Sequence, residues 1–205
     1  MTTQCGILID LNKCTGCNAC IVACKQEFDL PPRMNALPGT KGFSFIRVEC
    51  IGPEGEYPAL WMYYQPIFCM HCADPPCVEV CPSEAIYKQT NGLVLIDKEA
   101  CTGCEACLPA CPYDVICMDN DQAVARKCDL CEHLIEQGHQ PACVAACNGG
   151  AMTSGDLGDE KSDISKSREG AGKDCFVLKP ENATRPSIYY LEFRKKSSNR
   201  LEIPR

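Results

Sequence analysis

The stretch Cys14-Thr15-Gly16-Cys17-Asn18-Ala19-Cys20-Ile21-Val22-Ala23-Cys24 decides how this chain of 205 residues folds. Its four cysteines have the spacing C-x2-C-x2-C-x3-C, which bacterial ferredoxins use to hold [4Fe–4S] clusters. In that run the fourth cysteine binds the neighbouring cluster of a pair. The spacing therefore predicts a fold organised around metal clusters, with thiolate–iron bonds supplying much of the folding free energy.

Three further groups of four cysteines follow along the chain. The third group repeats the spacing of the first, whereas the middle gap is four residues in the second group and eleven in the fourth. Because a cubane takes four thiolates, these sixteen cysteines predict four [4Fe–4S] clusters as cofactors. The predicted cofactor-binding and metal-ligating residues are Cys14, Cys17, Cys20, Cys24, Cys69, Cys72, Cys77, Cys81, Cys101, Cys104, Cys107, Cys111, Cys128, Cys131, Cys143 and Cys147.

The cysteine groups belong to an internal repeat. Ile7–Asp10 precedes the first group as Val94–Asp97 precedes the third, at a constant offset of 87 residues. A second match joins D-P-P-C-V around Cys77 with Q-P-A-C-V around Cys143. Self-similarity of this length indicates duplication of a ferredoxin-like unit.

Short elements are expected around the cysteine loops. Apolar segments at Gly6–Asp10 and Leu93–Asp97 predict strands that lead into the loops. Glu84–Lys88 and Leu93–Asp97 flank Asn91-Gly92, which favours the type I′ turn of a β-hairpin. Short helices are expected to begin near the third cysteine of each group. The glycine of each C-T-G-C motif would let the backbone approach a cluster.

The predicted fold class is α+β, with two ferredoxin-like units that each bind a pair of [4Fe–4S] clusters. Residues 1–24 and 118–152 are expected to form the unit with cluster pair one, and residues 68–117 the unit with cluster pair two. Residues 25–67 form an inserted loop and strand region, expected to serve in docking. Residues 153–205 are expected to form a surface loop and an extended C-terminal segment.

The composition of the inserted and C-terminal regions supports this division. Phe43–Val48 and Ala59–Tyr64 are apolar pieces within a Pro- and Gly-rich insertion and can pair as strands. Thr153–Asp174 is polar and free of aromatic residues, which predicts a surface excursion. Cys175–Leu178 and Ser187–Phe193 are strand-like or extended.

Charge and hydropathy limit the partners. The net charge of −7 argues against nucleic acid, and no apolar segment of roughly 20 residues predicts direct membrane insertion. The basic Arg194–Lys196 is expected to be a solvated end rather than a docking arm. With no signal in the sequence, the expected location is cytoplasmic, or periplasmic and membrane-associated if a partner with a twin-arginine signal carries the chain.

Zinc and disulfides are the alternatives for clustered cysteines. The fourth group alone has the spacing of a structural zinc site, but three cysteines within seven residues, as in groups one and three, fit a cubane better.

His71 is expected to tune a cluster by hydrogen bonding or charge, and Lys13, Arg126 and Lys127 adjoin ligands, where a cation would raise a cluster potential. The remaining cysteines are expected to be small buried hydrophobes: Cys5, Cys50, Cys117 and Cys175.

These motifs resemble the four-cluster electron-transfer (beta) subunit of molybdopterin oxidoreductases of the dimethyl sulfoxide reductase family. The resemblance is carried by C-T-G-C-N-A-C, C-M-H-C-A-D-P-P-C-V-E-V-C-P, C-T-G-C-E-A-C-L-P-A-C-P-Y and K-C-D-L-C…P-A-C-V-A-A-C. It covers roughly Gly6–Met152, with a weaker similarity in residues 179–190. One departure is Cys147-Asn148, where many relatives have Cys-Pro.

The resemblance implies how the groups combine, which the spacing leaves open. In the family, groups one and four build one pair of clusters, nearer the catalytic subunit, and groups two and three build the other pair. The duplication alone also permits a tandem combination, of group one with two and three with four. The implied ligand sets are Cys14, Cys17, Cys20 and Cys147; Cys24, Cys128, Cys131 and Cys143; Cys69, Cys72, Cys77 and Cys111; and Cys81, Cys101, Cys104 and Cys107.

The resemblance implies a non-catalytic subunit that relays single electrons through four clusters, as in anaerobic respiratory reductases. Its expected partner is a large molybdenum or tungsten bis-pterin catalytic subunit, with a membrane-anchor, quinone-reactive subunit as a further candidate. The alternatives are the small subunit of a soluble transhydroxylase-like or dehydroxylase molybdoenzyme acting on phenols, and a free polyferredoxin. No dinucleotide fingerprint or nucleophile–base arrangement indicates catalysis by this protein itself.

Overall fold

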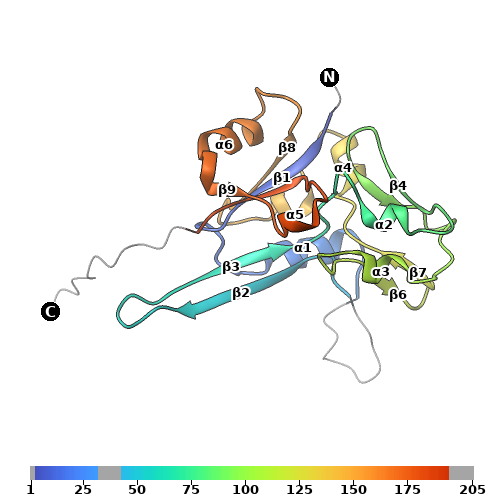
Figure 1. Ribbon diagram of the computed structural model, residues 1–205, viewed down its shortest axis with the longest axis horizontal. Coiled ribbons are helices and arrows are strands. Elements are labelled where there is room, and N and C mark those ends of the chain that lie inside the picture. Colours follow the sequence, from blue (N-terminus) through green and yellow to red (C-terminus); the bar gives the residue numbers. More distant parts are fainter. Residues whose placement is uncertain (1–2, 32–42, 194–205) are drawn as a thin grey trace.

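Figure 1 shows the computed structural model of the chain, which describes residues 3–31 and 43–193. Residues 32–42 of the expected docking insertion, and the basic Arg194–Lys196, lie outside these ranges. Within the described ranges, no helix is long and apolar enough to cross a lipid bilayer. One four-stranded sheet and three two-stranded sheets form a mixed α/β architecture.

The elements are short because cysteine loops interrupt them. The strands are β1 (Cys5–Asp10), β2 (Arg47–Glu54), β3 (Trp61–Ile67), β4 (Ile86–Lys88), β5 (Val94–Ile96), β6 (Cys117–Asp119), β7 (Val124–Arg126), β8 (Met152–Asp156), β9 (Cys175–Phe176) and β10 (Ile188–Leu191). The helices are α1 (Ala19–Glu27), α2 (Pro76–Glu79), α3 (Cys107–Ala110), α4 (Glu132–Glu136), α5 (Ala142–Ala145) and α6 (Asp163–Ala171), with short 3-10 helices η2 (Gly172–Asp174) and η3 (Pro180–Asn182).

Segments from both ends of the chain form the four-stranded sheet, in the order β8-β1-β10-β9 (Figure 1). β1 pairs in parallel with β10, with Ile7 opposite Ile188 and Ile9 opposite Tyr190, and antiparallel with β8. These four side chains are at most 1% exposed. β1 and β10 are therefore the buried centre of the sheet, which explains the continuous apolar sequence of β1.

Three antiparallel hairpins complete the strands: β2–β3, β4–β5 and β6–β7. The β2–β3 hairpin is the longest and projects from the body of the molecule (Figure 1). The insertion forms a hairpin, but the two predicted pieces do not pair with each other. Arg47 and Val48 lie opposite Ile67 and Pro66, and Tyr63 and Tyr64 lie opposite Ile51 and Cys50. The inner end of the hairpin is buried at Ile67, whereas its outer end exposes Tyr57 (89%) and Leu60 (55%).

The predicted helices and strands next to the cysteine loops are confirmed. α1, α2, α3 and α5 each begin within one residue of the third cysteine of a group, and β1 and β5 lie where the repeat predicted strands. Pro76 occupies the first turn of α2, where its missing N–H leaves no intrahelical hydrogen bond unmade. The cysteine loops therefore end where local sequence favours a helix.

The β4–β5 hairpin is confirmed, but its turn differs from the predicted type I′ turn. The N–H of Gly92 donates to the carbonyl oxygen of Gln89 at 3.0 Å. The N–H of Gln89 donates to the carbonyl oxygen of Leu93 at 2.8 Å. A type I′ turn needs positive φ at both central residues, whereas here Gly92 (84°) has positive φ and Asn91 does not. The Asn91 side chain instead accepts from the N–H of Leu93 at 3.1 Å, which favours a longer loop.

The polar segment Thr153–Asp174, expected to be a surface loop, contains β8 and α6. β8 pairs with β1 through its backbone, which a polar composition does not prevent. In α6, Ile164 is fully buried and the N-cap Ser162 accepts from the N–H of Ser165 at 3.2 Å. The extended C-terminal segment likewise supplies β9 and β10 to the central sheet.

Candidate iron–sulfur cluster sites

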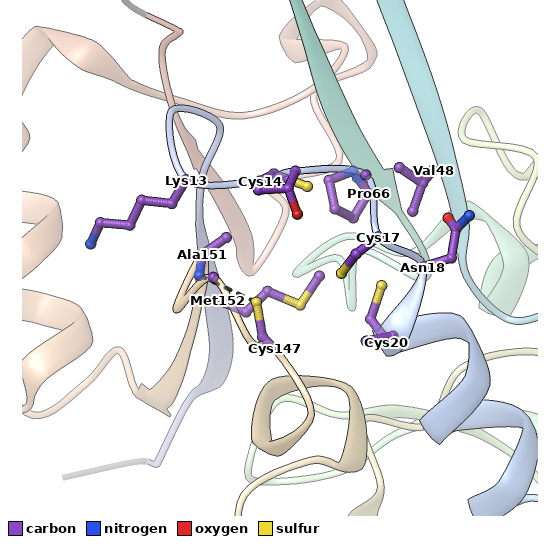
Figure 2. A pocket seen from close by; sticks show the side chains of 14 residues that line it. Lys13, Cys14, Cys17, Asn18, Cys20, Val48, Pro66, Cys147, Ala151 and Met152 are labelled. Carbon is purple, nitrogen blue, oxygen red and sulfur yellow. Dashed lines mark hydrogen bonds between the residues drawn. The ribbon is translucent and has the colours of Figure 1, made fainter.

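Three cysteines of the first group and the last cysteine of the fourth group line one cavity, the first site (Figure 2). Cys14 and Cys17 lie in the loop between β1 and α1, Cys20 is on the first turn of α1, and Cys147 follows α5. The β2–β3 hairpin closes another side of this cavity. Cys17 is exposed and Cys20 is buried, so the site reaches the surface on one side.

The second site joins Cys24 with the other cysteines of the fourth group. α1 packs against α5, and electrostatic interactions connect Cys24 with Cys131 and Cys143 and also with Cys128. All four cysteines are buried. This set of sulfurs lies in the interior of the protein.

The third site is a cavity lined by Cys69, Cys72 and Cys77 of the second group and Cys111 of the third group. The cysteines of the second group are buried and Cys111 is half-buried. Cys69 also interacts electrostatically with Cys128, so the second and third sites are neighbours.

The fourth site contains Cys101, Cys104 and Cys107 of the third group together with Cys81. Electrostatic interactions connect Cys107 with these three residues, and α2 packs against α3. Cys104 is exposed, as Cys17 is in the first site. Each site therefore joins three cysteines of one group with the fourth cysteine of another.

The donor sets fit an iron–sulfur cluster. Thiolate sulfur is the donor that such clusters take, and N–H groups directed at the sulfurs help to set their potentials. Three backbone N–H groups donate hydrogen bonds to cysteine sulfurs. They are those of Leu130 to Cys128 (3.4 Å), Ala151 to Cys147 (3.2 Å) and Ala125 to Cys101 (3.5 Å).

Both C-T-G-C glycines have a left-handed backbone conformation. Gly16 and Gly103 have φ of 68°. A Cβ on Gly16 would lie 2.5 Å from the ring of Tyr64, and one on Gly103 would lie 2.4 Å from the carbonyl oxygen of Ala123. These loops therefore require glycine for both conformation and space.

Burial changes the acidity of the thiols. It raises the pKa of Cys20 to about 11 and that of Cys24 to about 12. At the exposed Cys17 the backbone N–H of Ala19 instead lowers the pKa. Buried thiols without metal are therefore protonated near neutral pH, so binding of iron must release protons and is coupled to folding.

Zinc takes four ligands around one ion, with zinc–sulfur distances of about 2.3 Å. Among residues 3–31 and 43–193, no three histidine, cysteine or carboxylate side chains are placed to hold a single metal ion. The cysteines of the first and third sites line cavities.

Two buried polar side chains lie between the second and third sites. His71 is fully buried, its Nδ1 accepts from the N–H of Val94 at 3.0 Å, and its Nε2 has no partner among the described residues. Burial and the nearby Lys127 lower the pKa of His71 well below its usual range. Lys127 is 6% exposed, lines the third cavity and donates to the carbonyls of Val94 and Cys128.

The cysteines outside the four sites are only partly as predicted. Cys5 is buried at the start of β1. Cys50 is exposed on β2, contrary to the prediction, because the outer part of the hairpin has no layer over it. Cys117 and Cys175 are half-buried.

Sequence reasoning missed two hydroxyl groups at the third site. Tyr113 lines the cavity, and its hydroxyl lies 2.6 Å from the hydroxyl of Thr184. Tyr113 follows Cys111 closely, which is a weak signal. Thr184 is distant in sequence from every cysteine of the site, and only the fold brings it there.

Comparisons with known proteins show that the chain contains iron–sulfur cluster-binding domains. A family model described as a 4Fe-4S dicluster domain matches residues 60–157, and one described as a 4Fe-4S binding domain matches residues 7–28. The chain is 37% identical to the B component of tetrathionate reductase of Salmonella typhimurium, over 90% of this chain and 71% of that protein. It is 35% identical to the B component of anaerobic dimethyl sulfoxide reductase of Escherichia coli (91% and 94%), and 37% identical to the thiosulfate reductase electron transfer subunit of Salmonella typhi (78% and 80%).

The cysteine sites and the matching cluster-binding domains define an iron–sulfur electron carrier. More particularly, this protein belongs to the family of iron–sulfur electron-transfer subunits of dimethyl sulfoxide reductase-type molybdopterin oxidoreductases, which confirms the resemblance of its motifs. It is an electron-transfer subunit rather than a catalytic one. The relatives support this reading over a phenol transhydroxylase subunit.

Proposed function

We propose that each of the four sites binds one [4Fe–4S] cluster and that the chain relays electrons to or from a molybdenum- or tungsten-pterin catalytic subunit. The observation that carries this proposal is the shared cavity of Cys14, Cys17, Cys20 and Cys147, which fits the crossed combination of groups. When bound, each cluster would accept and release single electrons, whereas the metal centre of the partner changes by two per turnover.

Burial supports a linear path through the four sites. The first and fourth sites each contain an exposed cysteine, Cys17 and Cys104, whereas the second and third contain none. Cys143 interacts with Cys20 of the first site, and Cys128 interacts with Cys69 of the third. Electrons would therefore enter at one exposed end and leave at the other, while the protein keeps water away from the middle sites. In this arrangement residues 1–24 and 118–152 hold one pair and residues 68–117 the other.

Paired alanine variants test the crossed combination. In that combination Cys24 and Cys128 serve the same cluster, so Cys24→Ala/Cys128→Ala should lose no more iron than either single variant. In the tandem combination Cys24 serves the cluster of the second group, so the same double variant should lose a second cluster. Iron and acid-labile sulfide are measured per chain on the complex purified without oxygen.

The pair Cys24→Ala/Cys69→Ala is a matched control with the opposite expectation. The crossed combination predicts that its losses add, whereas the tandem combination predicts that they do not. Additive loss in the Cys24/Cys128 pair together with non-additive loss in the Cys24/Cys69 pair would overturn the crossed assignment.

The partner is tested by native mass spectrometry of the protein isolated anaerobically from its own cells. We expect a complex with a large chain that carries a molybdenum or tungsten pterin. A third, membrane-spanning chain would identify the quinone-reactive anchor. A lone chain loaded with four clusters would contradict the proposed partner and favour a free polyferredoxin.

A further inference from the structure

An open hollow lies beside the third cavity and has a volume of about 130 Å³. No cysteine is among the described residues that line it. Its wall includes the exposed Lys98 and Tyr87, which is 43% exposed. A water molecule needs only about 10–15 Å³ of such space, so the hollow has room for several waters. Solvent can therefore approach the third site from this side.

The walls of the hollow are fixed by packing and charge. The Arg126 guanidinium pairs with Asp119 at 3.1 Å and lies 5.3 and 5.4 Å from the ring centres of Phe43 and Phe45. Phe28 packs edge-on against Phe45, with ring centres 5.4 Å apart. Arg126, Phe28 and Phe45 all line the hollow. The hollow is therefore a formed feature of the fold.

Lys127 separates the hollow from the third cavity. Among the described residues that line either space, it alone lines both. Although the hollow is open to solvent, Lys127 is only 6% exposed. This one side chain therefore stands between water and the position of the third cluster.

Buried hydrogen bonds hold the Lys127 ammonium in this position. Nζ donates to the carbonyl oxygens of Val94 and Cys128, at 3.1 Å for Cys128. The N–H of Val94 in turn donates to Nδ1 of the fully buried His71 at 3.0 Å, so the residue that accepts from Lys127 is itself fixed. A buried charge needs such partners, because its transfer from water without them is costly. The ammonium is therefore held inward rather than free in solvent.

We propose that Lys127 seals the third cluster from the water of the hollow and stays seated because the anionic cluster attracts its ammonium. The inference rests on the proposed function, since it takes the third cavity as a cluster site. The shell around a metal site controls the access of solvent. At an unsealed site, the reduced cluster gives one electron to dioxygen, which yields the oxidised cluster and superoxide. The seal keeps that electron on the path between the second and third sites.

Three variants test the seal in the intact complex purified without oxygen. Lys127→Ala removes most of the side chain, Lys127→Met removes the charge but keeps most of the volume, and Lys98→Ala changes an exposed wall of the same hollow. The third cluster is identified by the electron paramagnetic resonance signal that Cys72→Ala lacks. After dioxygen is added to the reduced complex, this signal should decay roughly tenfold faster in Lys127→Ala than in Lys127→Met. It should decay in Lys98→Ala as in the native complex.

Lys127→Met is the comparator because the loss of a charge alone lowers the potential of the cluster and so favours its oxidation. Equal decay in Lys127→Ala and Lys127→Met would overturn the seal. A second readout is independent of dioxygen: in deuterium oxide, electron spin-echo modulation from deuterium at the reduced third cluster should be deeper in Lys127→Ala than in Lys127→Met. Equal modulation would also overturn the seal.

If Lys127→Ala fails to retain the third cluster, Lys127→Val, which leaves a smaller opening, is compared with Lys127→Met by the same two measurements. Equal decay or equal modulation would again overturn the seal. Loss of the third cluster from both shortened variants without oxygen would overturn it too, because the lysine would then hold the cluster rather than shield it. A native complex with fewer than four clusters would instead contradict the proposed function.

Discussion

At the scale of single residues, Gly16 shows how closely the chain is built around the first site. The ring of Tyr64, from the β2–β3 hairpin, occupies the place where a Cβ on Gly16 would lie. The hairpin can therefore cover the first cavity only if position 16 has no side chain. The same glycine also has the positive φ that directs the loop from Cys14 towards Cys17.

Gly16→Ala should lower the folding stability by more than the penalty of a positive φ at alanine alone. Gly138 also has positive φ (77°) but has no atom within 4 Å of its built Cβ, so Gly138→Ala is the matched control. We expect Gly138→Ala to lower stability by about 1–2 kcal/mol with full iron content. Gly16→Ala should lower it further and lose the first cluster, as measured by melting temperature and iron content. Equal effects of the two variants would contradict this prediction, because they would show that the Tyr64 ring can move to make room for the methyl group.

Lys127 is the second residue whose position matters, because it is a buried cation in the wall of the third cavity. Lys127→Met keeps most of the side-chain volume and removes the charge, so a cluster beside it should be harder to reduce. We expect a fall of its potential corresponding to about a tenfold change in the reduced fraction, roughly 59 mV. Lys98→Met, an exposed position, should leave all potentials unchanged. Equal shifts in the two variants would contradict a local charge effect.

At the scale of elements, the segment Leu178–Ser187 between β9 and β10, which we call the strap, is held to the loop after Cys72 by a surface ion pair as well as by backbone hydrogen bonds. Arg185 donates two hydrogen bonds to the carboxylate of Asp74, at 2.5 and 2.6 Å. The pair is largely exposed, so its contribution is small and screened by salt. It fastens the strap to the loop just after Cys72.

The ion pair gives the strap a defined pH dependence. The Arg185 guanidinium lowers the pKa of Asp74 below its ordinary value. A depressed pKa stabilises the folded state above the unfolded pKa, and this contribution is lost as pH falls through the folded value. Hydrogen-exchange protection of the Ala73 and Asp74 amides should thus be constant from about pH 6 to 8. Asp74→Asn, which mimics the acid form, should lower that protection at neutral pH, and unchanged protection would contradict the role of the pair.

The elements also show what the sequence could and could not predict. β1, the helices at the third cysteines and the sixteen candidate ligands follow from local pattern, because spacing and apolar runs are local signals. The pairing of β1 with β10 does not, since it depends on contacts between the two ends of the chain. α6 was missed because its apolar face consists largely of Ile164, and Thr184 because no local motif marks it. The crossed combination of cysteines came from family resemblance and stays a proposal.

At the scale of the whole molecule, the cysteine sites hold together segments that are distant in sequence. The first site joins the loop before α1 with Cys147, two residues after the end of α5, and many of these cysteines also belong to the main apolar core. Iron would therefore be part of the core, and the protein without it would keep little packed structure around the sites.

Removal of iron should unfold most of the chain. We expect anaerobic treatment with a chelator to abolish the cooperative thermal transition and the near-ultraviolet circular dichroism, because buried thiols and empty cavities cannot replace the lost bonds. Return of iron and sulfide under reducing conditions should restore both signals. A metal-free chain that still melts cooperatively at the native temperature would contradict this coupling.

The order of the segments along the chain has a consequence for synthesis on the ribosome. The cysteines of the third and fourth sites lie between Cys69 and Cys111. The first site cannot be complete until Cys147 has been synthesised, and the central sheet cannot be complete until β10 has been. Since a chain emerges from its N-terminus at about 5–20 residues per second, the sites in the middle of the sequence can fill before those that involve its beginning. The strap emerges later than any of these cysteines, so all ligands of the third site are available before the nascent chain can close over it.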